Sequence, residues 1–245
     1  MITHKKLYNK NKSIRKNKPI LDLVYANYYK LAKECIIMSK NPTLEIGSGG
    51  GNIKKFIPKC ITSDQFINPN LDQKQNIYNI NYKNNYLSNI ILIDVFHHLE
   101  FPRLALNEIH RVLKKKGRVV MIEPAMGILP RIIYKFFHHE PNGFNYKINW
   151  DKIPKNINKI KKYFAAQSLS WRAFVLKEMN LKKNFEVVSL QTFSDFAFLM
   201  SGGNSYSFSL YSSRFYPLLK NIDKILTFLS KSFFSARMLV VLEKI

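Results

Sequence analysis

A glycine-rich turn that follows a short apolar strand constrains this chain more than any other feature. Residues 43–52 read TLEIGSGGGN, with Glu45 two positions ahead of the first glycine. Glycine tolerates positive φ and lets a ligand lie where a Cβ would collide, so Gly47, Gly49 and Gly51 predict close approach of a bound molecule. Because ligands of open α/β sheets bind at the carboxyl ends of strands, we expect the Glu45 carboxylate at the same site.

The spacing of the glycines excludes two common nucleotide sites. A dinucleotide fingerprint requires G-x-G-x-x-G, and its third glycine would fall on Asn52. The sequence also has no G-x-x-x-x-G-K-[ST] pattern, which excludes a P-loop. What remains is E-x-G-x-G-x-G, which taken alone also fits a tight strand-to-helix turn that binds nothing.

Two further segments are predicted to be strands that end near acidic residues. The segment Cys60–Asp64 is short and apolar until its final aspartate. A carboxylate at this place can accept hydrogen bonds from both hydroxyls of a ribose, although a turn aspartate that caps its own backbone has the same pattern. The segment Asn89–Leu99 reads as a buried strand with Asp94 near its end.

The order of the next elements points to one family. The histidines His97 and His98 precede an amphipathic helix over Pro102–Lys115, and Lys115–Pro124 supplies a turn glycine and another apolar strand. The succession D-V-x-H-H-L, helix, R-V-L-K-x-x-G-R-V-V-x-x-E-P, after E-x-G-x-G-x-G, resembles the ubiquinone/menaquinone C-methyltransferase-like (methyltransferase type 11) branch of the class I S-adenosylmethionine (SAM) dependent methyltransferases. The resemblance covers residues 40–125.

This resemblance implies an α/β, Rossmann-like fold with a seven-stranded, mostly parallel sheet, an antiparallel last strand and helices on both faces. It also implies SAM as the cofactor. Asn76 stands where the family usually has an aspartate that accepts from the adenine amino group, and the asparagine carbonyl can also accept. The cofactor-binding residues that the resemblance implies are Glu45, Gly47, Ser48, Gly49, Gly51, Asp64, Asn76 and Asp94.

The chain is expected to form one domain behind a basic arm. Residues 1–19 are rich in Lys and Asn and are expected to be poorly ordered, and residues 20–245 are expected to form a single methyltransferase domain. Residues 125–184 depart from the core pattern, which predicts an insertion that caps the acceptor pocket, with a helix near 165–179.

Hydrophobic periodicity predicts the other elements of the domain. Helices are expected at residues 20–40, 52–58 and 218–229, and strands at residues 184–193 and 236–245. In the resembled fold, the first of these helices lies over the cofactor.

Composition adds limits on compartment and partners. The 39 basic and 16 acidic residues give a net charge of +23, which favours an anionic-membrane contact or nucleic acid, whereas dispersed Lys from an AT-rich genome is the alternative explanation. The two cysteines have no metal-type spacing, and no apolar run has the length of a membrane span. We expect a cytoplasmic protein, with a position peripheral to the inner face of a membrane as a further option.

Methyl transfer needs an aligned acceptor and needs a general base only when the acceptor must lose a proton. His98 and His138 are the candidate catalytic residues, because histidine titrates near neutrality; a structural histidine or a polar loop is the alternative for each. Glu140 is a candidate partner of His138. No ligand spacing connects the two histidine loops, so no metal is expected.

The predicted function is methyl transfer from SAM to an O or C acceptor on a small molecule, including a glycan or lipid-linked intermediate. The N-P-P-Y or D-P-P-Y motif of the amino-methylating DNA and protein glutamine enzymes is absent after the fourth strand, where residues 94–97 read DVFH. Cys35 and Cys60 lack the Pro-Cys or Thr-Cys context of base C5 methylation. The alternatives are an RNA methyltransferase, suggested by the charge, and a non-catalytic SAM-fold binding protein.

Overall fold

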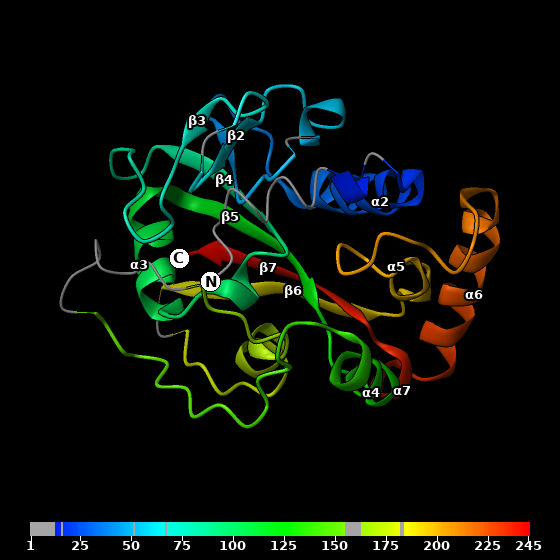
Figure 1. Ribbon diagram of the computed structural model, residues 1–245. Helices are drawn as coiled ribbons and strands as arrows, with labels where there is room; N and C mark the ends of the chain where they lie inside the picture. Colours follow the sequence, from blue (N-terminus) through cyan, green and yellow to red (C-terminus); the bar gives the residue numbers. More distant parts are fainter. Residues whose placement is uncertain (1–12, 16, 51, 67, 155–162, 182–183) are drawn as a thin grey trace.

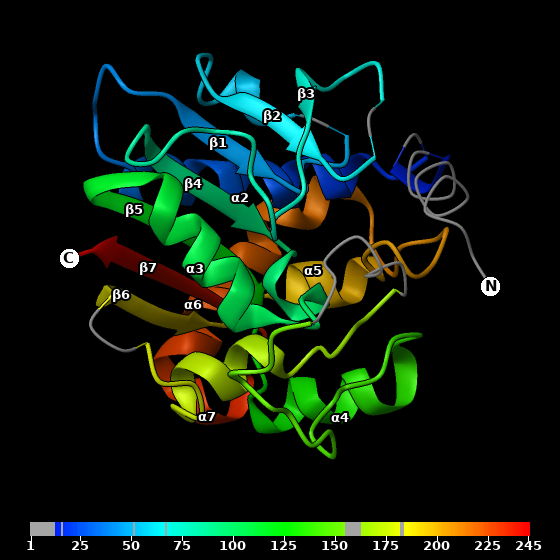
Figure 2. The ribbon, with the colours of Figure 1, turned by 90° about the vertical axis from the view of Figure 1, so that its left-hand side faces the viewer.

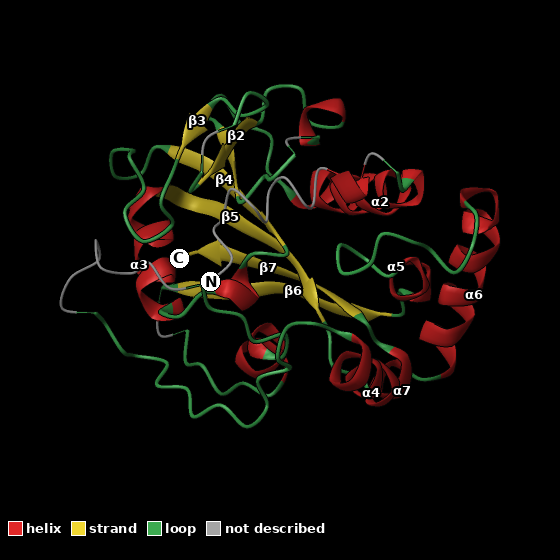
Figure 3. Ribbon diagram, in the orientation of Figure 1, coloured by secondary structure: helices red, strands yellow, loops and turns green. Residues whose placement is uncertain are grey.

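The computed structural model describes residues 13–15, 17–50, 52–66, 68–154, 163–181 and 184–245. Its centre is a seven-stranded sheet in the order β3-β2-β1-β4-β5-β7-β6, with helices on both faces (Figures 1 and 3). The strands are β1 (Thr43–Ile46), β2 (Ile61–Asp64), β3 (Gln73–Lys74), β4 (Leu87–Ile93), β5 (Leu113–Pro124), β6 (Phe185–Phe193) and β7 (Arg237–Lys244).

The sheet is parallel except at its last strand. Strands β1 to β5 pair in parallel, and β7 runs antiparallel to both of its neighbours, β5 and β6. All seven residues of β4 are buried, as expected for a central strand covered by helices on both faces. The predicted seven-stranded, Rossmann-like fold with an antiparallel last strand is therefore confirmed.

Side chains of alternate residues in the central strands pack into two separate hydrophobic cores, one on each face of the sheet. Ile90 and Leu92 of β4 pack toward α3 (Pro102–Val112), whereas Ile91 and Ile93 pack toward α2 (Pro19–Cys35). Each of these helices begins at a proline, whose missing N–H costs nothing in a first helical turn. Figures 1 and 2 show the two helices on opposite faces of the sheet.

The remaining helices gather at one end of the sheet. They are α4 (Ile128–Phe137), α5 (Phe196–Ser201), α6 (Tyr216–Leu229) and α7 (Lys231–Phe234). Elsewhere the chain forms the short helical turns η1 (Ile53–Lys55), η2 (Phe96–His98), η4 (Trp171–Val175) and η5 (Ser213–Phe215). The strands predicted at 184–193 and 236–245 and the helix at 218–229 are confirmed. None of the described helices is long and apolar enough to cross a membrane.

Two predicted helices are wrong. The first crossover, expected as a helix over residues 52–58, is a single 3₁₀ turn at η1. Pro58 disfavours the helical conformation at Ile57, which leaves too few residues for a stable helix.

The helix predicted near 165–179 is also replaced, by the π-helical turn η4. The segment before η4 bonds to other loops rather than to itself: Ala166 N donates to His97 O at 3.0 Å and Ser168 N donates to Asn142 O at 2.8 Å. Helix α4, by contrast, was not predicted. The described part of the segment predicted as an insertion thus crosses and bonds to other loops, including η2.

The predicted arm lies partly outside the described residues, which lack 1–12 and 16. Of the rest, Lys18 is buried, and its Nζ donates to Gly203 O at 2.7 Å and to Tyr206 O at 3.1 Å. This contact fixes the start of α2 against the segment that follows α5. The division into an arm, one domain and a capping insertion stays a prediction.

Candidate functional site

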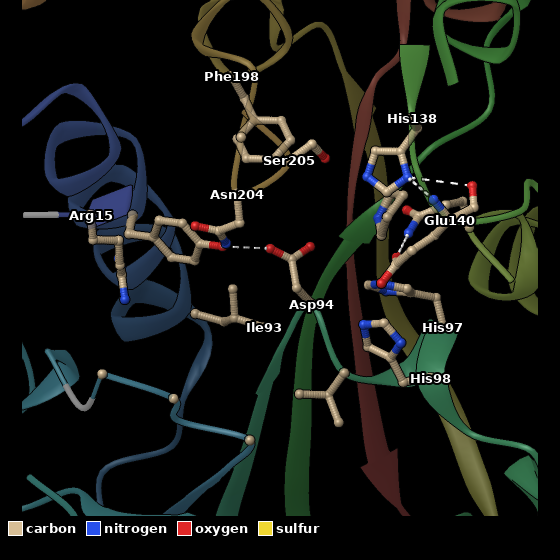
Figure 4. A pocket seen from close by; sticks show the side chains of 18 of the residues that line it. Arg15, Ile93, Asp94, His97, His98, His138, Glu140, Phe198, Asn204 and Ser205 are labelled. Carbon is tan, nitrogen blue, oxygen red and sulfur yellow. Dashed lines mark hydrogen bonds between the residues drawn. The ribbon is translucent and has the colours of Figure 1, made fainter. Parts of the chain in front are cut away.

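A cavity of about 730 Å³ opens where β1, β2 and β4 end. It is lined at one end by the turn after β1 and by Asp64, and at the other by histidines of η2 and of the segment after α4. Figure 4 shows Arg15 at one side, Asp94 at the centre, and His97, His98, His138 and Glu140 at the other side. The sheet edge predicted to carry the site is thus the edge that carries the cavity.

The turn after β1 needs glycine where the sequence predicted it. Gly47 has φ +79°, and a Cβ built on it would lie 2.4 Å from Val95 Cγ2. Gly49 has φ +52°, also in the left-handed region. Ser48 fixes the turn to β2, since its N donates to Ser63 O at 2.9 Å and its Oγ accepts from Ser63 N at 3.1 Å. Gly51 lies outside the described residues.

Asp64 caps its own turn and also lines the cavity, and its predicted contact with a ribose stays a prediction. Its Oδ2 accepts from Gly49 N at 3.2 Å and its Oδ1 accepts from Phe66 N at 3.3 Å, so it caps its own turn. It also lines the cavity. Its position at the end of β2 therefore holds the glycine turn in place and presents a carboxylate to a ligand.

Two buried polar side chains at the β1 end, Glu45 and Arg15, each have atoms without a hydrogen-bond partner among the described residues. Glu45 is 2% exposed, and its Oε2 accepts no hydrogen bond there. Burial raises the pKa of the Glu45 carboxyl to about 7, while a hydrogen bond from Ser48 and the Arg15 charge act in the opposite direction. Arg15 also lines the cavity, with Nε and Nη2 buried and unbonded and its guanidinium 4.4 Å from the Tyr25 ring centroid.

These unbonded groups fit an amino acid. A carboxylate and a guanidinium at one end of a cavity are complementary to the ammonium and the carboxylate of a methionine moiety. The neighbouring Asn204 Oδ1, buried and without a partner among the described residues, is a further acceptor. The residues present therefore fit SAM. The sequence analysis missed Arg15, because its lysine- and asparagine-rich surroundings gave no sign of a fold contact.

Asp94 is mainly an anchor. It follows β4 with φ +57°, and its carboxylate accepts from Tyr25 Oη at 3.0 Å and from both terminal nitrogens of Arg237, with Nη2 at 3.4 Å. Burial alone would raise the pKa of Asp94, but the Arg237 charge outweighs it and holds the pKa below the usual value. Asp94 also lines the cavity, and its predicted contact with the cofactor stays a prediction.

Asn76 is not among the residues that line the cavity. Its Oδ1 accepts from Tyr78 N at 3.0 Å, which closes a local turn. Its predicted contact with adenine stays a prediction, and nothing in its position supports it.

At the other end of the cavity, the buried carboxylate of Glu123 holds the loop after β4. Its Oε1 accepts from Val95 N at 2.8 Å and from Phe96 N at 2.7 Å. Its Oε2 accepts from His97 N at 3.3 Å, from His97 Nδ1 at 2.7 Å and from Ser170 Oγ at 3.1 Å. This side chain fixes both the backbone of η2 and the ring of His97. The pattern that pointed to Glu45, an acidic residue near the end of a buried strand, also points to Glu123.

The two candidate catalytic histidines are neutral at pH 7. Burial, together with the neighbouring His97, lowers the pKa of His98 to about 4. Burial also lowers the pKa of His138 to about 4. His98 Nδ1 lies 3.1 Å from Phe164 O, and His138 Nδ1 accepts from Glu140 N at 3.1 Å. Both line the cavity, but neither has the pKa near 7 that the prediction of a general base assumed.

The structure brings together groups that the sequence kept apart. Atoms of His97, His98 and Glu140 that can act as ligands all lie within 4.8 Å of one another. The expectation that nothing connects the two histidine loops was therefore wrong. The physical reason is the crossing of the cap segments, in which Ala166 and Gln167 bond to the loops that carry His97 and Pro141.

The sequence model of a methyltransferase domain matches residues 44–121. Among solved structures, the chain is similar to the [4+2]-cyclase SpnF, at 11% identity and a TM-score of 0.51 over 89% of this chain and 80% of that one. It is also similar to geranyl diphosphate C-methyltransferase from Streptomyces coelicolor A3(2), solved with Mg²⁺, geranyl diphosphate and S-adenosyl-L-homocysteine. That likeness has 10% identity and a TM-score of 0.51, over 94% of this chain and 84% of that one.

The chain therefore has the fold of the class I SAM-dependent methyltransferases. Residues 44–121 match the methyltransferase domain, whose cofactor is SAM. No curated protein sequence matches the chain significantly.

We expect Glu123→Gln to lower the free energy of unfolding by about 3–5 kcal/mol, since an amide has one acceptor oxygen and its NH₂ would face the donors that the carboxylate now satisfies. Urea unfolding measures this change. Glu186→Gln, an exposed carboxylate on β6, is the matched control, with an expected change within about 0.5 kcal/mol. Equal urea midpoints for the two variants would contradict the role given to Glu123.

Proposed function

We propose that this chain transfers a methyl group from SAM to an O or C acceptor on a small, apolar or lipid-linked molecule. The observation that carries the proposal is one cavity with the unbonded atoms Glu45 Oε2 and Arg15 Nε and Nη2 at one end and a histidine-rich wall at the other. Membership of the ubiquinone/menaquinone C-methyltransferase-like branch is part of this proposal and is supported by the D-V-F-H-H-L motif of the sequence.

The residues divide the work between the two ends. Glu45 and Arg15 hold the charged groups of the methionine moiety, Gly47 and Gly49 leave room for it, and Asp64 accepts from the ribose. When bound, SAM supplies a methyl group activated by its sulfonium charge. The cap loops exclude water and align the acceptor, which accounts for most of the acceleration of an in-line displacement.

The wall of the cavity favours a small molecule over RNA. Among the described residues that line it, the only Lys or Arg side chains are Arg15 and Arg237, and Arg237 is buried and paired with Asp94. The wall itself therefore offers few cations to a phosphate-rich polymer. The other alternative is a non-catalytic SAM-fold binding protein. Such a protein would bind SAM equally well and would differ only in transferring no methyl group to an acceptor.

Titration calorimetry with SAM tests the cofactor end. We expect Glu45→Ala and Arg15→Ala each to weaken SAM binding at least about tenfold, because each leaves one charge of the ligand unpaired in a buried site. His98→Ala should leave the dissociation constant within about threefold of wild type. No binding at millimolar SAM, or an equal loss in all three variants, would overturn the division of the cavity.

The pH dependence of binding follows from the pKa of Glu45, which is about 7 in the free protein. A protonated Glu45 cannot pair with an ammonium group, so the dissociation constant for SAM should fall as pH rises from 5 to 7, by about fiftyfold if only the ionised form binds. The ligand's α-amino group stays protonated throughout this range. Calorimetry at several pH values measures the slope, and Glu45→Gln should flatten it. A wild-type dissociation constant that does not change with pH would contradict the assignment.

We further propose that the acceptor is delivered from an anionic membrane surface. Helix α4 exposes Ile128, Ile132 and Phe136 at helical spacing, and Arg131 and Lys135 are exposed beside them. Helix α6 has a second exposed stripe, formed by Leu218, Ile222, Ile225 and Leu229, and α7 packs against both helices (Figure 1). The next residues after the α4 stripe, Phe137 and His138, line the cavity.

Vesicle cosedimentation tests this membrane contact. We expect binding to phosphatidylcholine vesicles with 30% phosphatidylserine and at least about fivefold weaker binding to pure phosphatidylcholine. The double variant I132D/F136D should lose binding while keeping its SAM affinity. Met38→Asp, at an apolar residue before β1 that is more exposed than either α4 residue, is the control and should bind as wild type does. Unchanged binding in the α4 variant would contradict the proposal.

A further inference from the structure

Three side chains from two loops converge on one point of the acceptor wall. His97 and His98 belong to η2, and Glu140 follows α4, more than forty residues later in the chain. Their ligand atoms lie within 4.8 Å of one another, and all three line the cavity (Figure 4). Two imidazoles and one carboxylate form a common donor set for a divalent transition-metal ion.

Each histidine is already oriented as a ligand. A carboxylate or carbonyl oxygen only accepts, so the Nδ1 atoms that face Glu123 Oε2 (2.7 Å) and Phe164 O (3.1 Å) carry hydrogen. In the neutral rings this leaves the lone pair on Nε2. Among the described residues no hydrogen bond engages Nε2 of His97 or His98. Carboxylate–histidine and carbonyl–histidine contacts of this kind fix the tautomer and ring orientation of metal ligands in proteins.

Glu140 is held in the same way. Tyr163 Oη donates to its Oε1 and Gln167 Nε2 donates to its Oε2. Each carboxylate oxygen keeps a further acceptor site. The side chain is only 11% exposed, and it is anchored on the cap rather than extended into solvent.

The charge of the wall also calls for a cation. Two carboxylates, Glu123 and Glu140, lie close to His97, whereas the nearby Asp94 already has Arg237 as its partner. A divalent ion at the three ligands would balance both carboxylates in a buried place. Tetrahedral ligands with bonds of about 2.1 Å lie about 3.4 Å apart, so the three groups need to close by at most about 1.4 Å, which small side-chain rotations supply.

We propose that His97, His98 and Glu140 form a divalent transition-metal site on the acceptor wall of the cavity. Its remaining coordination positions face the cavity and take an oxygen atom of the acceptor, a hydroxyl or a phosphate. The role toward the acceptor rests on the proposed function, whereas the binding of the metal does not.

Calorimetry with Zn²⁺ on the untagged full-length chain, first freed of metal by a chelator, tests the site. We expect one equivalent to bind with a dissociation constant in the micromolar range or below, and His98→Ala and Glu140→Gln to weaken it at least about hundredfold. His110→Ala, a histidine of α3 whose ring packs on Phe185, is the matched control and should bind as wild type does. Co²⁺ should give visible absorption bands of a four- or five-coordinate ion in the wild type and the control alone.

Absence of one-to-one binding, or equal binding in all variants, would overturn the proposal. SAM titrations of the same proteins with chelator present separate this outcome from failure of the proposed function. A chain that binds SAM but no Zn²⁺ loses only the metal site, and a chain that binds Zn²⁺ but no SAM loses only the proposed function.

Discussion

The histidine-rich wall of the cavity depends on one buried carboxylate. Glu123 ends β5 and accepts five hydrogen bonds from the loop after β4, from His97 and from Ser170. A carboxylate suits this place because it only accepts, and every group that faces it donates. Since Ser170 belongs to the cap segment, the same side chain joins the sheet, the histidine turn and the cap. Burying the charge is tolerable only because these partners are complete.

A second buried charged side chain, Arg237, joins several elements at the centre of the sheet. Arg237 begins β7 and pairs with Asp94 at the end of β4, while its guanidinium lies over the rings of Tyr28 and Phe198. Helix α2 is thereby connected to both strands and to α5. The two acids at the ends of these adjacent strands, Asp94 after β4 and Glu123 near the end of β5, thus have different partners: Asp94 pairs with a guanidinium, and Glu123 accepts from backbone and side-chain donors.

The sequence predicted what is encoded locally. The glycine turn, Asp64 and the central strands follow from residues within a few positions of one another, and they were found where expected. Arg15 and Arg237 could not be found this way, because their partners lie far away in the chain. The prediction of a helix at 52–58 failed because Pro58 outweighed a weak helical pattern. The prediction of a helix near 165–179 failed because Ala166 bonds to His97 rather than within a helix. The meeting of His97, His98 and Glu140 is a result of that cap and is invisible to any local pattern.

Lys18 ties the amino-terminal segment to the rest of the fold, which its lysine- and asparagine-rich composition does not suggest. Its ammonium group donates to the carbonyl oxygens of Gly203 and Tyr206. Lys18 comes three positions after Arg15, whose guanidinium is the only one among the described residues at the β1 end of the cavity. A fragment that starts at Pro19 would retain α2 and every strand of the sheet. It would lack Arg15 of the cavity wall, the Lys18 contact and Ile14, which belongs to the core beneath α2. Trimming the chain to its sheet and long helices would therefore remove part of the cavity as well.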